Sequence, residues 1–337
     1  MSASRRPKTL LAFSPARNPD TIAPEQRARL ESLVTLQLPD PVEHFDDARA
    51  VLAQTEVLIT GWGAPRVDRA TLERMPALRL IAHLAGSVKN ILDAAVWQRG
   101  ILVTSAAEAN ADPVAEYTLA AIILMNKRAL KLRDAYRESH VWPRPLRDHA
   151  PGLGNYRKTI GIIGASRVGR KVIALLKQFA FDILLYDPYV DKAEAERLGA
   201  RKVELDALLA KSDVVSIHAP ETHETYRMID ARGLASMKSG AILINTARGS
   251  LVDTEALAAV LSQGRIDAVL DVTDPEPLPG DSPLYSLPNV LLTPHIAGAA
   301  GAETHRLTET ILEEIDRYAH GLPLAHGIDA AALEHLA

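Results

Sequence analysis

The stretch GIIGASRVGR, residues 161–170, follows a β-like run and leads into a segment whose apolar residues have helical spacing. Through Gly164, Ser166 and Gly169 it reads G-x-S-x-x-G, so it differs from the dinucleotide-binding fingerprint G-x-G-x-x-G only in its middle residue. Serine is small, and its hydroxyl can donate a hydrogen bond to a phosphate oxygen. The stretch therefore predicts a strand, a glycine turn and a helix whose first N–H groups bind a pyrophosphate.

The residues after the turn support this prediction. Arg167 and Val168 begin the helical pattern, so their backbone N–H groups are the expected pyrophosphate donors. Asp187 follows Gly169 by 18 residues, at the end of the next β-like run, where a carboxylate receives the adenosine ribose hydroxyls. A carboxylate there repels a 2′-phosphate, which indicates NAD rather than NADP as the cofactor. The alternative, a strand–turn–helix unit that binds nothing, accounts for none of these matches.

Short apolar runs alternate with helical patterns along the whole chain, which is typical of parallel βα units. The first five runs occupy residues 9–13, 34–38, 56–62, 78–84 and 101–106. Six more follow the glycine turn region at residues 159–164, 182–187, 213–220, 241–247, 266–272 and 290–295. Six strands are what a doubly wound nucleotide-binding domain requires. The pattern predicts an α/β chain with two doubly wound parallel-sheet domains, a Rossmann domain inserted in a flavodoxin-like one.

The domain boundaries follow from the segments between these two series. A long helical pattern covers residues 113–139, with Asp112 placed as its N-cap and Pro113 as its first residue. A second amphipathic pattern follows His295 and is expected to return to the first domain. We therefore expect a Rossmann NAD-binding domain over residues 110–298, and a substrate-binding domain formed by residues 1–109 and 299–337.

The composition excludes several classes of protein. The chain has 337 residues, 47% of them hydrophobic, and a formal net charge of −4, which offers no basic field for a nucleic acid. It has no cysteine, so disulfides, thiolate metal sites and a cysteine nucleophile are excluded, and we expect a cytoplasmic protein without a metal site. Arg5 and Arg6 precede an apolar run too short for an export signal. The apolar run at residues 119–125 is too short to cross a membrane.

Three charged side chains stand at the ends of predicted strands of the second domain. Arg248 lies in NTARGSLVD, Glu276 in LDVTDPEPLP and His295 in TPHIAG. Open parallel sheets place their ligands at the carboxyl ends of the strands, so these residues are expected to converge on one small anionic substrate. Each residue alone fits a loop or a turn equally well. Their combination with a dinucleotide fold favours catalysis.

The motifs GIIGASRVGR, YDPY, HAPETHETYRMI, NTARGSLVDTEAL, LDVTDPEPLP and LTPHIAG, in this order, resemble those of the D-isomer-specific 2-hydroxyacid dehydrogenase family over essentially the full length of the chain. The resemblance implies that His295 is the general acid/base for the substrate carbonyl and that Glu276 orients its imidazole. It implies that Arg248 pairs with the substrate carboxylate. The activity implied is hydride transfer between NAD(H) and a small 2-keto or D-2-hydroxy acid.

The resemblance also implies contacts with the cofactor. It places the adenine against His218, Ala219 and Pro220, with Thr225 nearby. It places Thr246 and Arg248 along the nicotinamide, and Asp271 at its carboxamide. Gly298 completes the wall of the site after His295.

The chain departs from the family in the first domain. The family holds the substrate carboxylate with a glycine-rich loop, often G-x-G-x-D-N, where this chain reads HLAGSVKNI. Ala85 and Ser87 stand near positions that are usually glycine, and Lys89 replaces the usual aspartate. Gly86 and Ser87 still present amides, so we expect Ala85, Gly86 and Ser87 to contact the substrate. Trp142 is expected to pack in the core or in an interface.

The resemblance implies a homodimer formed through the long helix, a small-molecule substrate, and no nucleic-acid or membrane partner. Candidate substrates are glyoxylate, hydroxypyruvate, branched or aromatic 2-keto acids and 3-phosphohydroxypyruvate. An NAD(H)-sensing regulatory or corepressor-like protein is the main alternative, because the family includes such proteins, although they tend to carry long disordered tails. Formate dehydrogenase shares the fold but has glutamine in the place of Glu276.

Overall fold

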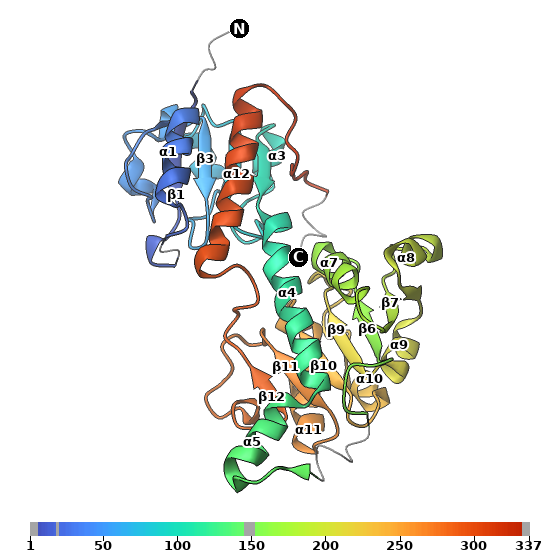
Figure 1. The fold of residues 1–337 in the computed structure, drawn as a ribbon. Helices are drawn as coiled ribbons and strands as arrows, with labels where there is room; N and C mark the ends of the chain where they lie inside the picture. The colour runs from blue at the N-terminus through green and yellow to red at the C-terminus, as the bar shows by residue number, and fades with distance from the viewer. Residues whose placement is uncertain (1–5, 18–19, 145–151, 332–337) are drawn as a thin grey trace. The chain divides into compact units, whose positions relative to one another are not determined.

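The structure is a computed structural model that describes residues 6–17, 20–144 and 152–331. The chain divides into two compact units, Met1–Asn110 with Ala299–Leu336 and Ala111–Gly298. The first boundary thus falls at Asn110, where the sequence placed it at residue 109. Figure 1 shows the first unit in blue to teal and red, and the second in green to orange. In the described part of the chain, no helix combines the length and apolar character that crossing a membrane requires.

The first unit is built on a parallel sheet of five strands in the order β2-β1-β3-β4-β5. This is the flavodoxin-like order, and the prediction of a doubly wound fold is confirmed. Each strand lies within or beside one of the apolar runs seen in the sequence, and the inner strands are almost wholly buried. The strands are β1 Lys8–Ala12, β2 Thr35–Leu36, β3 Val57–Thr60, β4 Leu80–His83 and β5 Leu102–Ser105.

Helices cover both faces of this sheet. On one face α1 (Pro24–Leu33) and α12 (Thr304–Ala319) pack side by side, so the last helix of the chain covers strands formed by the first hundred residues (Figure 1). Their buried side chains include Leu30, Leu307 and Ile311. The other face carries the short helices α2 (Arg69–Arg74) and α3 (Ala95–Gln98). The two apolar layers explain why the strands lack a polar side.

The second unit contains a parallel sheet of seven strands in the order β12-β11-β10-β9-β6-β7-β8. The chain runs outward from β6 in one direction through β7 and β8, and in the other from β9 to β12, which is the Rossmann arrangement that the sequence predicted. Only the two-residue edge strand β8 was not predicted. The strands are β6 Thr159–Ile163, β7 Asp182–Tyr186, β8 Arg201–Lys202, β9 Val214–Ile217, β10 Ile242–Asn245, β11 Asp267–Leu270 and β12 Val290–Leu292.

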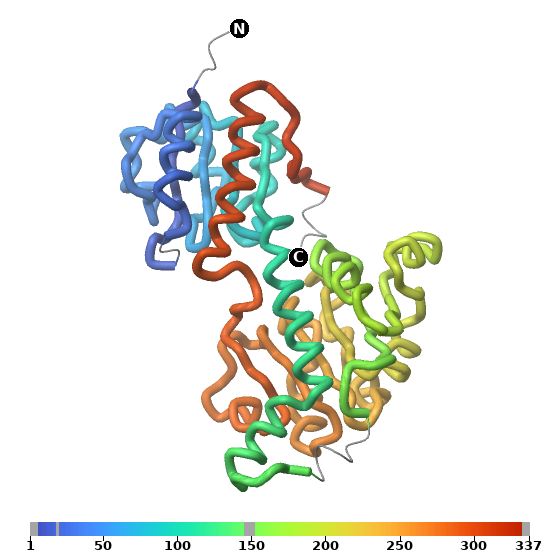
Figure 2. The backbone as a smooth tube through the Cα atoms, in the orientation of Figure 1, coloured from blue at the N-terminus to red at the C-terminus, as the bar shows by residue number. Residues whose placement is uncertain are grey.

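Two helical layers enclose the second sheet. Figure 2 follows the backbone of this unit as a tube in green to orange. One layer consists of α4 (Ala107–Asn126), α7 (Arg167–Leu176) and α8 (Lys192–Leu198). The opposite layer consists of α9 (Leu205–Lys211), α10 (Ala231–Ser236) and α11 (Thr254–Ser262). The strand order reverses between β6 and β9. At such a point the helices lie on opposite faces and leave the carboxyl edge of the sheet open for a ligand.

The prediction of one continuous helix over residues 113–139 is wrong in its start and in its continuity, although α5 does end at Ser139. Helix α4 begins at Ala107, directly after β5, and Pro113 lies inside it, while Asp112 pairs with Lys171 at 2.7 Å instead of capping a helix. The helix stops at Asn126 because the Asn126 carbonyl accepts a hydrogen bond from the N–H of Gly154 at 2.8 Å. Arg128 then adopts a left-handed conformation with φ of 49°, and α5 (Ala129–Ser139) follows. Part of the loop predicted after it, residues 145–151, lies outside the described residues.

Candidate active site

The glycine turn joins β6 to α7 through two positions that exclude a side chain. Gly164 has φ of +92°, and a Cβ there would lie 2.6 Å from the backbone nitrogen of Ala219. A Cβ on Gly169 would lie 2.0 Å from the carbonyl oxygen of Gly164. The turn therefore packs closely against the start of α7 and against the residues that follow β9, at the point where the strand order reverses.

Ser166 replaces the middle glycine of the fingerprint and caps α7. Its backbone is extended, and its hydroxyl oxygen accepts a hydrogen bond from the N–H of Gly169 at 3.3 Å. The side chain is thus folded back over the first turn of the helix. Its hydroxyl proton is not used in this bond and can still be donated to an anion. Arg167 and Val168 follow in the first turn, where helix N–H groups have no intrahelical acceptor.

Asp187 ties the glycine turn to the end of β7. One carboxylate oxygen accepts from the N–H of Ala165 at 2.7 Å, and the other accepts from the N–H of Tyr189 at 2.8 Å. A carboxylate has about four acceptor positions, so two remain for further donors. This arrangement suits the ribose-binding role predicted for Asp187, and it adds a structural role that the sequence did not reveal.

His218 is a buried histidine with an unsatisfied nitrogen beside the turn. It is 2% exposed, and its Nε2 lies 2.9 Å from the Ser216 hydroxyl, whereas Nδ1 has no hydrogen-bond partner in the described residues. Burial lowers the pKa of His218 to about 3, so the ring is neutral at physiological pH. Native proteins rarely leave such an atom without a partner. An orphaned polar atom next to a glycine cradle fits a site built for a dinucleotide.

The two predicted cofactor threonines are already bonded to the protein. Thr225 donates from its hydroxyl to the carbonyl of Pro220 at 2.7 Å, which closes the loop after β9. Thr246 is buried, and its hydroxyl lies 3.1 Å from that of Thr118 on α4. Thr225 therefore shapes the loop beside the turn, as a capping residue does, and Thr246 holds the end of β10 against α4.

Glu276 and His295 form a pair at the carboxyl edge of the sheet. Glu276 Oε1 lies 2.7 Å from His295 Nδ1, and both side chains are about half exposed. A carboxylate only accepts hydrogen bonds, so Nδ1 carries a proton and Nε2 is the nitrogen left for a ligand. Such a pair can transfer a proton at Nε2 while the carboxylate orients the ring and balances its charge.

Asp271, at the end of β11, holds the loop that carries His295. The carboxylate is 2% exposed and accepts from the N–H groups of Ile296 at 2.8 Å and Ala297 at 2.9 Å. It also accepts from the Thr293 hydroxyl at 2.6 Å. These three hydrogen bonds fix the backbone on both sides of His295, which itself has a left-handed conformation with φ of 55°.

Tyr117 on α4 extends this network. Its hydroxyl lies 2.8 Å from that of Thr293, and since Thr293 donates its only proton to Asp271, Tyr117 must donate to Thr293. Burial raises the pKa of Tyr117, and the negative charge of Asp271 acts in the same direction. The sequence did not point to Tyr117, which lies 176 positions before Thr293 and belongs to no motif of the site. Thr293 stands in the motif TPHIAG, but no role was predicted for it.

Arg248 lies on the loop after β10, next to the loop that carries Glu276. The side chain of Asn245 clamps this loop by donating to the carbonyl of Arg248 at 2.8 Å. A Cβ on Gly249 would lie 1.9 Å from the carbonyl carbon of Thr273, so the two loops touch. The Arg248 guanidinium donates to the carbonyl of Ala247 at 2.6 Å and contacts neither Glu276 nor His295 within the described chain. The structure thus pairs two of the three predicted catalytic residues.

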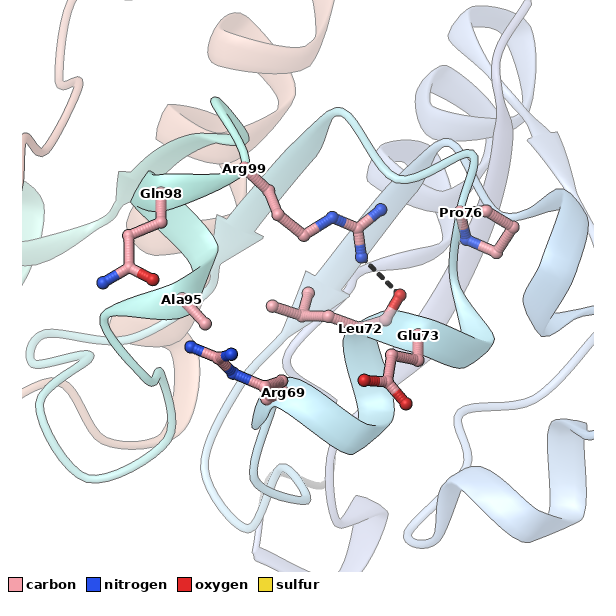
Figure 3. A pocket seen from close by; sticks show the side chains of 7 residues that line it. All are labelled: Arg69, Leu72, Glu73, Pro76, Ala95, Gln98 and Arg99. Carbon is pink, nitrogen blue, oxygen red and sulfur yellow. Dashed lines mark hydrogen bonds between the residues drawn. The ribbon is translucent and has the colours of Figure 1, made fainter.

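A cavity of about 610 Å³ opens beside the pair. Glu276, Thr293 and Pro294 lie on its wall together with the apolar residues Leu278, Tyr285 and Leu292. A cavity in the first unit, about 410 Å³ in volume, lies between α2 and α3 (Figure 3). There Arg99 donates to the carbonyl of Leu72, and Glu73 is the one carboxylate among the lining residues, with no histidine beside it. The acid/base chemistry therefore points to the cavity at Glu276.

His83, the last residue of β4, anchors the loop that is expected to hold a substrate carboxylate. His83 is 3% exposed, and its Nδ1 lies 2.9 Å from the Thr60 hydroxyl. Burial lowers its pKa to about 4, while a hydrogen bond with the Ser87 backbone acts in the opposite direction. The Ser87 hydroxyl accepts from the N–H of Lys89 at 3.4 Å. Ala85 is buried, whereas Gly86 and Ser87 are partly exposed.

Two further predicted residues lie at the margins. Gly298 is the last residue of the second unit, three positions after His295. Trp142 is 64% exposed, which excludes packing in a core of this chain and leaves an interface as its predicted environment.

Comparison with known proteins gives a consistent result. A family model described as "D-isomer specific 2-hydroxyacid dehydrogenase, NAD binding domain" matches residues 119–297, more than half of the chain. A D-3-phosphoglycerate dehydrogenase of Mycobacterium bovis is 36% identical over 301 residues, which are 89% of this chain and 56% of that protein. The chain thus spans about half the length of such relatives.

Other relatives are similar in length to this chain. A glyoxylate/hydroxypyruvate reductase B of Yersinia enterocolitica is 39% identical over 258 residues, 76% of this chain and 78% of that protein. The crystal structure of a phosphoglycerate oxidoreductase from Rhizobium etli superposes with a TM-score of 0.80 at 29% identity, over 96% of this chain and 98% of that one. Together with the matched domain, these similarities identify the glycine turn as part of a domain that binds a nicotinamide cofactor.

Proposed function

The chain belongs to the D-isomer-specific 2-hydroxyacid dehydrogenase family, and from this membership we propose that it catalyses the NAD(H)-dependent interconversion of a small 2-keto acid and the corresponding D-2-hydroxy acid. The observation that carries the proposal is the 2.7 Å contact between Glu276 and His295 at the sheet edge that also bears the glycine turn. A cofactor turn without an acid/base pair would suit a binding protein equally well.

His295 is proposed as the general acid/base. In the reducing direction Nε2 gives its proton to the carbonyl oxygen of the substrate, and in the oxidising direction it removes the hydroxyl proton. A bound nicotinamide supplies or accepts the hydride. Glu276 keeps the ring in one orientation and stabilises the positive charge that His295 carries before it gives up the proton. Arg248, a planar and permanent cation, pairs with the substrate carboxylate and polarises the carbonyl.

The cofactor is proposed to be NAD(H), and the contacts described above favour this assignment. Asp187 retains two acceptor positions for the ribose hydroxyls and would repel a 2′-phosphate. Asp271 uses both acceptor positions of one oxygen and one position of the other, which leaves a single acceptor for a carboxamide N–H. The remaining contacts are proposed for Gly164, Ser166, Arg167, Val168 and Gly169 with the pyrophosphate, for His218, Ala219 and Pro220 with the adenine side, and for Thr246 and Gly298 with the nicotinamide side.

The substrate carboxylate is proposed to be held also by backbone amides of Ala85, Gly86 and Ser87. Support comes from the anchoring of this loop, because His83 joins Thr60 to the Ser87 backbone in a buried site. Lys89, in place of the usual aspartate, adds a cation to the loop. The activities for which the relatives are named suggest glyoxylate, hydroxypyruvate and 3-phosphohydroxypyruvate as the first substrates to test.

A homodimer in the cytoplasm is proposed as the working form. Helix α5 has no buried residue, and Leu124 on α4 and Tyr136 on α5 are 53% and 50% exposed. Apolar groups left in water on two consecutive helices favour burial against a second copy of the chain. The absence of cysteine is in keeping with a reducing compartment. An NAD(H)-sensing regulator is disfavoured because it would not need a paired Glu276 and His295.

The test is the oxidation of NADH, followed by its absorbance, against a panel of 2-keto acids, with NADPH in parallel. We expect turnover of at least one panel member by the wild type with NADH and a loss of about a hundredfold or more in His295→Asn, since general acid/base catalysis contributes on this scale. NADH binding, measured by fluorescence titration, should be unchanged in the variant. Near-normal turnover by His295→Asn would refute the role of His295, and tight NADH binding without turnover of any panel member would favour the regulator.

A further inference from the structure

A small cavity of about 220 Å³ lies at the amino edge of the second sheet. The residues at the starts of four strands line it. Lys158, Asp213 and Ala241 directly precede β6, β9 and β10, and Asp267 is the first residue of β11. Parallel strands end together at the opposite edge, where the glycine turn and His295 are found. The cavity is therefore separate from the proposed active site, and what it binds does not depend on the proposed reaction.

Two cations at this cavity, Arg128 and Lys158, form no salt bridge with any described residue. Arg128 reaches over Gly240, where a Cβ would lie 3.3 Å from its Nη2, and Lys158 reaches over Gly152, where a Cβ would lie 3.0 Å from its Nζ. In the described part of the chain, neither cation forms a salt bridge, whereas the neighbouring Lys238 is paired with Asp213 at 3.0 Å. Lys158 attracts Asp213 and Arg128 attracts Asp267, so their charges are partly offset, but no direct salt bridge occupies their donors. Half-buried cations with such donors favour an anionic ligand.

Asp267 is a third charged group at the same cavity. It is half-buried and forms no salt bridge within the described ranges, although Arg128 and Lys131 are near enough to act on it. Burial raises the pKa of Asp267, and the attraction of these two cations offsets only part of this effect. The second carboxylate at the cavity, Asp213, is held by Lys238 and by the N–H of Thr159. The cavity thus combines two cations that form no salt bridge in the described residues with Asp267, whose carboxylate favours a proton on itself or on its partner.

We propose that this cavity binds a phosphoryl group, either inorganic phosphate or the head of a phosphate monoester, through Arg128, Lys158 and Asp267. The ligand oxygens accept from the Arg128 guanidinium and the Lys158 ammonium, and a P–OH group donates to the Asp267 carboxylate. Sulfate fits the two cations equally well, but it carries no proton at neutral pH and meets Asp267 as a like charge. A zwitterionic amino acid satisfies Asp267 but leaves one cation uncompensated.

Equilibrium dialysis of the full chain against radiolabelled inorganic phosphate, with NADH at saturation and ionic strength held constant with chloride, measures this binding directly. We expect one phosphate per chain and at least about tenfold weaker competition by sulfate, since sulfate cannot donate a hydrogen bond to Asp267. Competition by glycerol phosphate distinguishes the two sources: equal competition indicates that the site accepts an ester, and weak competition indicates inorganic phosphate.

Three variants locate the site. Arg128→Met and Lys158→Met should each weaken phosphate binding about tenfold or more. Asp267→Asn should raise the affinity for sulfate and reduce the difference between sulfate and phosphate. Arg157→Met is the matched control, because Arg157 precedes Lys158 in sequence, stacks on Tyr156 and does not line the cavity, so phosphate binding should be unchanged.

The proposal is overturned if the wild type retains no phosphate, if sulfate competes as well as phosphate, or if Arg157→Met weakens binding as much as Lys158→Met. Phosphate that remains bound in both Arg128→Met and Lys158→Met belongs to the active site and also overturns it. Unchanged NADH affinity shows that a variant is folded. Should Arg128→Met fail this check, because Arg128 precedes α5 in a left-handed conformation, Lys158→Met and Asp267→Asn decide the question.

Discussion

Glu276 Oε1 lies 2.7 Å from His295 Nδ1, although the two residues follow different strands, β11 and β12. The contact determines which nitrogen of His295 carries a proton in the resting protein. It also places a negative charge beside the ring that is proposed to gain and lose a proton during the reaction.

Replacing Glu276 with glutamine separates orientation from charge. The glutamine carbonyl can still accept the Nδ1 proton of His295, but the negative charge is gone. We expect kcat to fall about a hundredfold while the KM for the keto acid changes little, because the loss affects mainly the proton transfer. Steady-state kinetics of Glu276→Gln measure this. A kcat within a factor of about two of the wild type would contradict the role given to the carboxylate.

The choice of cofactor rests on Asp187, and the structure determines how to test it. Asp187→Arg removes the repulsion of a 2′-phosphate but also removes the acceptor for the N–H groups of Ala165 and Tyr189. We expect the preference to shift toward NADPH while kcat/KM falls for both cofactors. Asp187→Asn keeps one acceptor oxygen and should shift the preference with a smaller loss. If the ratio of kcat/KM for NADH and NADPH is unchanged in both variants, the ribose site lies elsewhere.

The contact at Gly249 predicts a coupled loss of stability and activity. A Cβ in Gly249→Ala would lie 1.9 Å from the backbone of Thr273, so the loops that carry Arg248 and Glu276 must move apart. Overpacking of this kind costs at least about 1–3 kcal/mol, so we expect a lower Tm and a lower kcat. Gly280→Ala is the control, because nothing lies within 4 Å of a Cβ there. A wild-type Tm and kcat in Gly249→Ala would show that the loops do not need this close approach.

The buried His83 predicts a loss of stability in mild acid. Its pKa is about 4 in the folded protein, against 6.5 for an ordinary histidine, so the unfolded chain binds a proton in a range where the folded chain does not. The contribution of His83 is complete above about pH 6.5 and is lost as the pH falls toward about 4, at roughly 1.4 kcal/mol per pH unit. His83→Gln has no proton to gain in either state.

Thermal unfolding at about pH 7 and about pH 5 measures this effect. The wild type should lose more stability between the two pH values than His83→Gln, even if the variant is less stable at neutral pH. His44→Gln, at an exposed histidine, should retain the wild-type dependence. Equal slopes for the wild type and His83→Gln would mean that His83 is protonated in the folded protein.

Much of the architecture was predictable from local sequence. The apolar runs of both series became parallel strands, because runs of this length bounded by turn residues can be buried on both sides of a sheet. The glycine turn was recognisable because two of its positions require glycine. Gly164 has φ of +92°, and a Cβ on Gly169 would lie 2.0 Å from the carbonyl oxygen of Gly164. The roles of His295, Glu276 and Arg248 remain predictions, although their positions at strand ends followed from the same pattern.

Other features were settled only by tertiary structure. The Gly154 N–H ends α4 at Asn126, where the local sequence favours a continuous helix, and Tyr117 reaches Thr293 across 176 residues of chain. Lys158 and Asp267 lie at one cavity because β6 and β11 begin at the same edge of the sheet, and the link between α4 and α5 brings Arg128 to it. Local propensity reports on neighbours within a few residues, whereas these contacts depend on which strands and helices lie together once the chain has folded.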